Sequence, residues 1–333
     1  MSYTELNIED VKESREKMIE VFQRRRFDSY GLKEKINVGQ ASGLRSRKIL
    51  AVDSGFNSAY ETTFTIFKAA IVNEAMNVTE NTRTCFFQVD NQSTDRLKRL
   101  IMQETLYESL IKTIKTGKAD RHIAIVDGTI TLTIFHPTTR DNIEYREHFN
   151  NLVQEYYKPL MKECHRRDII LLGFLKQTGS TYLTEHINAG NLYDRHVIDT
   201  ILRTHGEFIS PIPITKPTMG PSELPFKYVT FYLNLKGWNY RFELLSSQES
   251  YFSECIQNML FWSTRTHFGM NPIFSKADEH ARVTKRKTNL IFNYLTNNLP
   301  ETIQSELLHE VQKRTHFGYH RGDRVDRLMK NDN

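Results

Sequence analysis

The amino-acid sequence predicts an α/β protein in which a sheet is flanked by helices, with further helices added at both ends of the chain. Three short apolar runs have the length and composition of buried strands, and they lie at 48–55 (KILAVDSG), 121–130 (RHIAIVDGTI) and 168–176 (DIILLGFLK). The segments that precede the second and third runs, 94–116 and 141–165, repeat apolar residues at helical spacing. Strands that alternate with helices in this way are typical of an α/β sheet.

The same patterns predict the other elements in turn. Apolar residues at helical spacing indicate a leading helix at 8–27. β-branched and aromatic residues indicate two strands at 59–73 and 82–90, so that the first apolar run opens a series of three strands. The region 178–225 is irregular and contains a Pro-rich stretch at 209–225. The last predicted elements are strands at 226–236 and 239–245, joined by a hairpin at Gly237-Trp238, and helices at 250–262, 274–297 and 301–313.

These elements divide the chain into three predicted parts. Residues 1–47 form an N-terminal helical extension, and residues 48–298 form the main domain. The irregular, Pro-rich region near 178–225 is an insertion in that domain. Residues 299–333 form a C-terminal helix and a basic tail.

The composition of the 333 residues is that of an ordinary globular protein, with 39% hydrophobic and 26% charged residues. No apolar run approaches the roughly 20 residues that a membrane-spanning helix needs. The polar, acidic start of the chain predicts no secretory signal peptide. The three cysteines are far apart in sequence, which indicates reduced thiols and a cytoplasmic protein without a disulfide framework.

The chain carries a formal net charge of +5, and its cations are clustered. Such clusters attract phosphate backbones without regard to sequence, although any one of them is more simply explained as a solvated surface. The clusters are RRR at 24–26, RSRK at 45–48, HRR at 165–167, RVTKRK at 282–287 and HRGDRVDR at 320–327.

Two aspartates stand at the ends of apolar runs. Asp53 follows Ile-Leu-Ala-Val and precedes Ser-Gly, and Asp127 follows Ile-Ala-Ile-Val and precedes Gly-Thr. The carboxyl ends of strands in α/β sheets commonly bind ligands, and a cation relieves the cost of burying a carboxylate. One such motif alone is more often a plain strand-to-turn junction. Two of them in one α/β unit favour a metal site.

Further acids follow on predicted helices. Glu104 and Glu108 share a helix face, so that one of them can point towards the aspartates; a solvated position is the better interpretation of Glu108. Asp278 and His280 lie about 200° apart around a helix, so that only one of the two can face the site. Carboxylate oxygens suit Mg²⁺ or Mn²⁺, and a pair of such ions supports the attack of water on a phosphodiester. The chain has no GxxxxGK[ST], HExxH or GxSxG motif that would indicate another chemistry.

The order and spacing of these motifs resemble the NurA-type DNA repair nucleases over roughly residues 45–290. The motifs are AVDSG, an acidic helix, IVDGT, GFLK, the strand pair YVTFYLNL and YRFEL, and NPIFSKADEHA. The resemblance implies an RNase H-like mixed sheet and a nuclease that depends on Mn²⁺ (or Mg²⁺), with two ions. It also implies a homodimer that binds DNA and works with a HerA-type hexameric ATPase in DNA end processing or phage defence.

The resemblance also implies roles for individual residues. Asp53 matches the first catalytic aspartate, Asp127 the aspartate of the second motif and Glu104, in MQETL, the helix glutamate. Lys176 matches the lysine that often ends the next core strand, and Arg241 matches an arginine before a hairpin acid. Both cations are expected to contact DNA phosphates, and a surface position at a strand end is an equally good interpretation of each.

The last motif departs from the family pattern. Asn271-Pro272 replaces Tyr-Pro, and Ala277-Asp278 stands where the family commonly has Ala-His. Alignment by the proline favours Asp278 as the fourth metal ligand, whereas alignment by residue type favours His280. We take Asp278 first and keep His280 as a candidate catalytic residue.

Two other functions remain open at the level of sequence. One is an RNase H-like adaptor that loads DNA onto an ATPase and cleaves nothing. The other is a nuclease of the same fold that acts on RNA. Both aspartates argue against the adaptor, whereas nothing in the sequence separates RNA from DNA.

Overall fold

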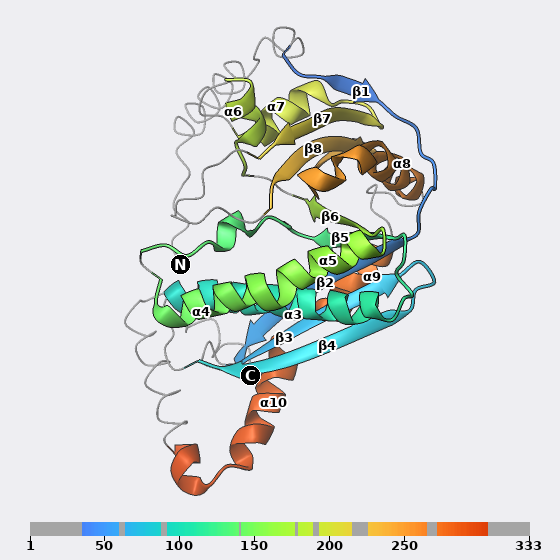
Figure 1. Ribbon diagram of the computed structural model, residues 1–333. Helices are drawn as coiled ribbons and strands as arrows, with labels where there is room; N and C mark the ends of the chain where they lie inside the picture. Colours follow the sequence, from blue (N-terminus) through green and yellow to red (C-terminus); the bar gives the residue numbers. More distant parts are fainter. Residues whose placement is uncertain are drawn as a thin grey trace, which may run out of the picture. The chain divides into compact units, whose positions relative to one another are not determined.

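A computed structural model of the chain describes most of residues 35–305 (Figure 1). These residues form two compact units, which we describe separately. The large unit contains described residues 47–59, 64–87, 92–139, 141–172 and 272–305, and the small unit contains 35–46, 173–176, 179–188, 193–214 and 226–264. The leading helix predicted at 8–27, residues 215–225 of the Pro-rich stretch and the basic tail lie outside the described residues.

The sheet of the large unit is mixed, with strand order β4-β3-β2-β5-β6. β2 pairs antiparallel with β3, and β3 pairs antiparallel with β4, whereas β2 and β5 are parallel. An antiparallel series of three strands that continues, after a helix, with a parallel neighbour of the first strand is the RNase H-like arrangement. The strands are β2 (Ile49–Ser58), β3 (Phe64–Asn73), β4 (Val78–Phe86), β5 (Ile123–Asp127) and β6 (Ile170–Leu175), and within β6 the chain passes into the small unit.

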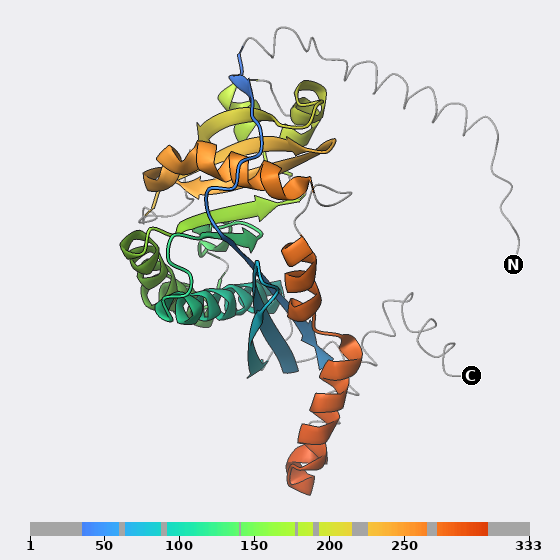
Figure 2. The ribbon, with the colours of Figure 1, turned by 90° about the vertical axis from the view of Figure 1, so that its right-hand side faces the viewer.

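Helices flank this sheet on both faces, as Figures 1 and 2 show. On one face lie α3 (Gln92–Lys115) and a continuous helical stretch made of α4 (Ile143–Asn151), the π-helical turn η3 (Leu152–Tyr157) and α5 (Lys158–Arg166). On the other face lie α9 (Pro272–Ala281) and α10 (Lys285–Asn297). The predicted fold class, an α/β mixed sheet flanked by helices, is therefore confirmed.

The predicted helix 274–297 is divided in the structure into α9 and α10. Thr284 has an extended backbone and begins the second helix, since its side chain accepts a hydrogen bond from the backbone N–H of Lys287. A threonine at this position favours a new helix start over a continuous helix. None of the helices that the structure describes has the length and apolar character needed to cross a membrane.

The small unit has an antiparallel sheet of order β1-β7-β8-β9, with helices packed against it. Both residues of the β8–β9 turn, Lys236 and Gly237, have positive φ (54° and 87°), as a two-residue hairpin loop requires. The turn is therefore one residue earlier than predicted, and Trp238 opens β9. The elements are β1 (Val38–Gln40), α6 (Tyr182–His186), α7 (Asp194–Ile201), β7 (Glu207–Pro213), β8 (Tyr228–Leu235), β9 (Trp238–Leu245) and α8 (Phe252–Ser263).

The three cysteines are free thiols, as the sequence predicts. Burial raises the pKa of the Cys164 thiol to about 12, so that it stays protonated and unreactive at neutral pH. Burial also raises the pKa of Cys85, against the opposing effect of the nearby Arg83 guanidinium.

A buried aspartate fastens the loop before α4, and its role can be tested by pH. The Asp141 carboxylate accepts hydrogen bonds from the backbone N–H (2.6 Å) and hydroxyl (2.8 Å) of Thr138 and pairs with Arg96. Burial by itself raises the pKa of Asp141, but these partners outweigh it and hold the pKa below the ordinary 3.8. We expect Asp141→Asn to cost about 2 kcal/mol at pH 7. The ionised Asp141 carboxylate contributes this free energy of unfolding fully at pH values above its pKa in the unfolded chain. The contribution is lost as the pH falls through the lower pKa that Asp141 has in the folded protein.

Urea unfolding of the two proteins at pH 7 and at several values below pH 4 measures this difference. The exposed Asp95, in the first turn of α3, provides the control variant Asp95→Asn. A stability difference between wild type and Asp141→Asn that stays constant down to the lowest pH would contradict the account.

Candidate metal centre

The parallel pairing of β2 and β5 brings Asp53 and Asp127 together. The register aligns Val52 with Val126, and the next residue of each strand is the aspartate. Neighbouring strands lie about 4.8 Å apart, and residues at the same level project to the same side. Asp53 is only 8% exposed, whereas Asp127 is partly exposed at the end of β5. The two carboxylates that the sequence singled out are therefore neighbours on adjacent central strands. Asp127 ends β5 as predicted, whereas Asp53 lies in the middle of β2, which continues to Ser58.

A third carboxylate reaches this place from α9. Asp53 and Asp278 both line a small pocket of about 210 Å³, together with the apolar side chains of Phe56 and Val283. Asp278 is half-exposed, and its ion pair with Arg282 is long, at 3.8 Å from Nη2 to Oδ2. Such an exposed pair contributes little, so that the carboxylate can take another cationic partner at small cost.

Gly55 allows α9 to approach the sheet closely enough to form this pocket. A Cβ atom at Gly55 would lie 2.9 Å from the Ala281 carbonyl oxygen, which belongs to the backbone and cannot rotate away. The absence of a side chain at Gly55 therefore sets the distance between Asp278 on the helix and Asp53 on the strand.

We expect Gly55→Ala to push α9 away from β2 and to destabilise the protein by about 1–3 kcal/mol, as overpacking does. Thermal unfolding measures the change. Gly179→Ala is the control, since a Cβ at Gly179 meets nothing within 4 Å. Equal unfolding temperatures for the two variants would show that the close approach is unimportant.

His280, the alternative to Asp278, is held by a partner that the sequence did not indicate. Its Nδ1 lies 2.6 Å from Glu80 Oε1, and the same oxygen accepts from Lys68 Nζ at 2.9 Å. These two donors, Lys68 first, lower the pKa of Glu80. The sheet register aligns Glu80 with Ala70 and Ala70 with Asp53, so that Glu80 and Asp53 project to the same face. A carboxylate that binds one ring nitrogen of a histidine fixes the orientation of the ring and therefore the direction of the second nitrogen. Carboxylates next to metal sites orient histidines in this way.

Glu104 lies on the other face of the sheet. It is fully buried on α3, where Oε2 accepts from Arg83 Nη1 at 2.8 Å and Oε1 lies 3.0 Å from His148 Nδ1. Arg83 on β4 is aligned with Phe67 on β3, which is aligned with Phe56 on β2. Phe56 is three residues after Asp53 on the same strand, so these side chains project to the face of the sheet opposite to that of Asp53. The described contacts of Glu104 are thus with Arg83 and His148, and its predicted role as a metal ligand stays a prediction.

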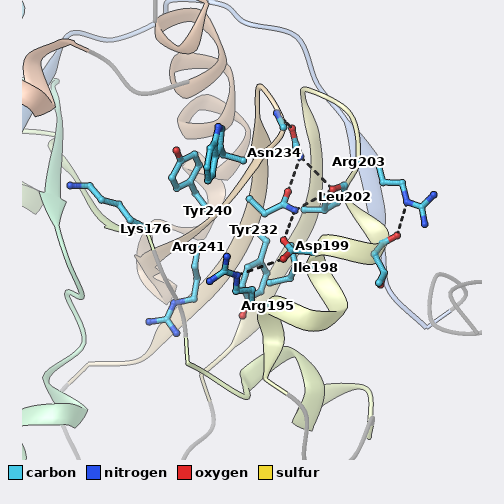
Figure 3. A pocket seen from close by; sticks show the side chains of 14 residues that line it. Lys176, Arg195, Ile198, Asp199, Leu202, Arg203, Tyr232, Asn234, Tyr240 and Arg241 are labelled. Carbon is cyan, nitrogen blue, oxygen red and sulfur yellow. Dashed lines mark hydrogen bonds and ion pairs between the residues drawn. The ribbon is translucent and has the colours of Figure 1, made fainter. Parts of the chain in front are cut away.

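Lys176 and Arg241, the predicted DNA contacts, both belong to the small unit and line one pocket there (Figure 3). Arg241 is buried, and its Nη2 donates to Glu243 Oε1 at 2.6 Å. Lys176 follows β6 directly and is exposed. Their contact with DNA stays a prediction.

The donors at the large unit's site fit a hard divalent cation. Asp53, Asp127 and Asp278 offer carboxylate oxygens, which Mn²⁺ and Mg²⁺ prefer, and no thiolate lies among them. Within the described ranges, no three Asp, Glu, His or Cys side chains lie close enough to hold an ion as they stand. Asp278 reaches the site from a helix rather than from the sheet.

The strand order and the paired aspartates define an RNase H-like α/β protein with an acidic site on its central strands. Residues 47–283 match the family model of the NurA domain. Because this match covers more than half of the chain, the protein belongs to the NurA family.

Solved structures agree with this assignment of the fold. The NurA nuclease from Sulfolobus solfataricus is similar with a TM-score of 0.62 at 16% identity, covering 86% of this chain and 97% of that one. A NurA bound to dAMP and manganese is similar with a TM-score of 0.59 at 10% identity, covering 90% of this chain and 99% of that one. A third, NurA with manganese, has a TM-score of 0.55 at 10% identity and covers 86% and 98%. No curated protein matches the chain.

Proposed function

We propose that this protein is a metal-dependent nuclease that hydrolyses phosphodiester bonds of DNA, with Asp53, Asp127 and Asp278 as the metal-binding residues. The observation that carries the proposal is the pair of aspartates aligned on β2 and β5, with Asp278 on the pocket of Asp53. Membership of the NurA family supports a nuclease.

Mn²⁺ is the proposed cofactor, with Mg²⁺ as the alternative, because manganese is present in two of the similar NurA structures. We propose two ions, which polarise the phosphodiester and lower the pKa of attacking water when bound. Asp53 and Asp127 hold the cations from the sheet, and Asp278 holds them from α9. His280, oriented by Glu80, is the proposed group for proton transfer, and Glu104 is a further ligand only if its bonds to Arg83 and His148 give way.

We further propose that the protein acts as a cytoplasmic homodimer with a HerA-type hexameric ATPase, in DNA end processing or phage defence. The support is the family to which the chain belongs. Co-purification with such an ATPase from the same genome, followed by measurement of the mass of the complex, tests this part separately from the activity.

The proposed activity is tested with end-labelled single-stranded and double-stranded DNA in a series of Mn²⁺, Mg²⁺, Ca²⁺ and EDTA. We expect degradation in Mn²⁺ that is absent in EDTA, and the length of the labelled products reports the polarity. RNA of the same sequence is included. Intact DNA in every metal, with and without the ATPase, would overturn the enzyme and favour the adaptor; preferential cleavage of RNA would change the substrate.

A further inference from the structure

Arg282 is a cation beside the carboxylates of the candidate metal centre. Among the described residues that line the pocket of Asp53 and Asp278, it is the single basic side chain. Arg282 directly follows the last residue of α9, and its side chain is 71% exposed. In the sequence it is the first residue of the cationic cluster RVTKRK at 282–287. Its place beside two acidic side chains is a property of the tertiary structure.

The backbone on both sides of Arg282 is fastened to β2. On one side, the Ala281 carbonyl oxygen lies so close to Gly55 that a Cβ atom there would be 2.9 Å away. On the other side, Asn57 Nδ2 donates a hydrogen bond to the Val283 carbonyl oxygen at 3.0 Å. The root of the Arg282 side chain is thus fixed over β2.

This anchor holds Arg282 on the side of the sheet to which Asp53 projects. Residues 53, 55 and 57 alternate along β2 and therefore lie on one face. Val283 is 8% exposed and belongs to the buried cluster that also contains Phe64 and Phe292. The backbone around Arg282 is therefore held by the core, while its own side chain extends into solvent.

The guanidinium of Arg282, by contrast, is held weakly. Nη2 lies 3.8 Å from Asp278 Oδ2, beyond the distance of a hydrogen bond, and the side chain of Asp278 is itself 53% exposed. Exposed pairs of this kind contribute little to stability. When Asp278 binds a cation, its charge is compensated and its attraction for Arg282 is lost. The guanidinium is then available to another anion at the same pocket.

A phosphodiester is the anion that the proposed reaction brings to this pocket. The attacking water loses a proton to His280, and its oxygen bonds to phosphorus. The leaving oxygen departs with the electron pair of the broken bond and takes up a proton from solvent. Negative charge builds up on the phosphate oxygens in the transition state, where a positioned cation stabilises it.

A guanidinium suits this task. Its planar fork of N–H donors matches two oxygens of a phosphate. It stays protonated in proteins, so that Arg282 donates hydrogen bonds and no proton.

We infer that Arg282 pairs with Asp278 in the protein without metal and, once Asp278 has bound the cation, donates hydrogen bonds to the scissile phosphate. Arg282 is thus a catalytic residue that exchanges a carboxylate for the substrate. The inference rests on the proposed function and deepens it. The alternative is a solvated arginine that only neutralises the carbonyl end of α9, where a cation is favourable by itself.

The first measurement is the affinity of the full-length protein for Mn²⁺ without DNA, from the electron paramagnetic resonance signal of free Mn²⁺. Arg282→Gln removes the cation that competes for Asp278, so we expect it to tighten Mn²⁺ binding about two- to fivefold. Arg282→Lys keeps the charge and should stay within about twofold of the wild type. Arg99→Gln, at an exposed arginine of α3, is the control for the change in net charge. Mn²⁺ binding that is unchanged or weaker in Arg282→Gln would overturn the exchange.

The second measurement is the rate of hydrolysis at saturating Mn²⁺, with end-labelled DNA and with the small diester bis(4-nitrophenyl) phosphate. Arg282→Gln should lower kcat for both substrates by about a hundredfold, as the loss of a donor to developing charge does. Arg282→Lys should recover part of the rate, because an ammonium supplies the charge without the fork of donors. Arg99→Gln should keep the wild-type rate. Tighter Mn²⁺ binding together with slower hydrolysis is a combination that a merely structural arginine would not produce.

The outcomes separate the inference from the proposed function. Hydrolysis by the wild type with an unchanged kcat in Arg282→Gln would overturn the inference alone. A loss confined to the KM for DNA, with normal hydrolysis of the small diester, would also overturn it, because Arg282 would then contact a neighbouring phosphate. No hydrolysis of either substrate by the wild type would refute the proposed nuclease and the catalytic contact with it. Thermal unfolding checks that each variant is folded, and at this exposed position we expect no change.

Discussion

Asp127→Asn and Asp53→Asn should each lower Mn²⁺-dependent hydrolysis of DNA by about a thousandfold or more while the protein remains folded. Both aspartates lie at the same level of adjacent strands, where the amide of asparagine retains the shape but not the charge. A bound cation is worth several kcal/mol of transition-state stabilisation, and each 1.36 kcal/mol corresponds to a factor of ten in rate. The initial rate of product release from end-labelled DNA, at fixed Mn²⁺, measures the loss.

The control for these variants is Asp120→Asn, which changes an exposed carboxylate of the same unit that pairs with Arg167. Its rate and the unfolding temperatures of all three variants should match the wild type within error. Wild-type activity in Asp127→Asn would remove this site from the mechanism even if the protein is a nuclease.

The same assay separates Asp278 from His280. Loss of Mn²⁺ affinity in Asp278→Asn supports Asp278, which lines the same pocket as Asp53, as the metal ligand. Glu279→Gln, a change at the exposed neighbouring residue, is the control. A change in the pH dependence of the rate in His280→Gln and in Glu80→Gln alike supports the paired histidine as the proton-transfer group. If Asp278→Asn keeps its Mn²⁺ affinity while His280→Gln loses it, the alignment by residue type was the better one.

The second large effect concerns stability. Glu104→Ala should lower the free energy of unfolding by about 3 kcal/mol, because it leaves Arg83 and His148 without the buried carboxylate that both contact. In a unit of this size the unfolding temperature would fall by roughly 10 °C. Urea unfolding and calorimetry measure both quantities.

Removing both charges tests whether the loss comes from the broken pair. The double variant Glu104→Leu, Arg83→Met should recover much of the stability, since an apolar pair of similar volume often replaces a buried ion pair without loss. Glu108→Gln, one turn further along α3, breaks the ion pair with the exposed Lys112, and the glutamine oxygen can still accept from Asn81 Nδ2, which lies 3.4 Å from Glu108 Oε2. It should change stability by less than about 0.5 kcal/mol. An unchanged or raised unfolding temperature in Glu104→Ala would contradict the structural role and favour the metal-ligand role.

Local sequence patterns predicted the fold class and the strands that carry the aspartates. The runs that lead to Asp53 and Asp127 are short and apolar, with a glycine directly after Asp127 and one residue further on after Asp53. These features depend on neighbours in the chain alone. These are the parts of the protein that short-range propensities and periodicity can predict.

The partners of the acids could not be predicted in this way. Glu80 lies on β4, where most side chains are exposed, and nothing near it in the chain indicates that His280, 200 residues later, binds it. Glu104 has the right residue type on the right helix, but the carboxylate meets Arg83 because of the register of β3 with β4.

The sequence by itself thus determined an α/β protein with one aspartate on each of two apolar strands. The predicted strand end is right for Asp127 and wrong for Asp53, since β2 continues to Ser58 through its pairing with β3. Tertiary structure alone decided which face each acid occupies, that Asp278 shares a pocket with Asp53, and that Arg241 and Trp238 line a separate cavity. The physical reason is that helix and strand periodicity are set by residues a few positions apart. Strand register and the packing of α9 on Gly55 are set by contacts between segments that are distant in the chain.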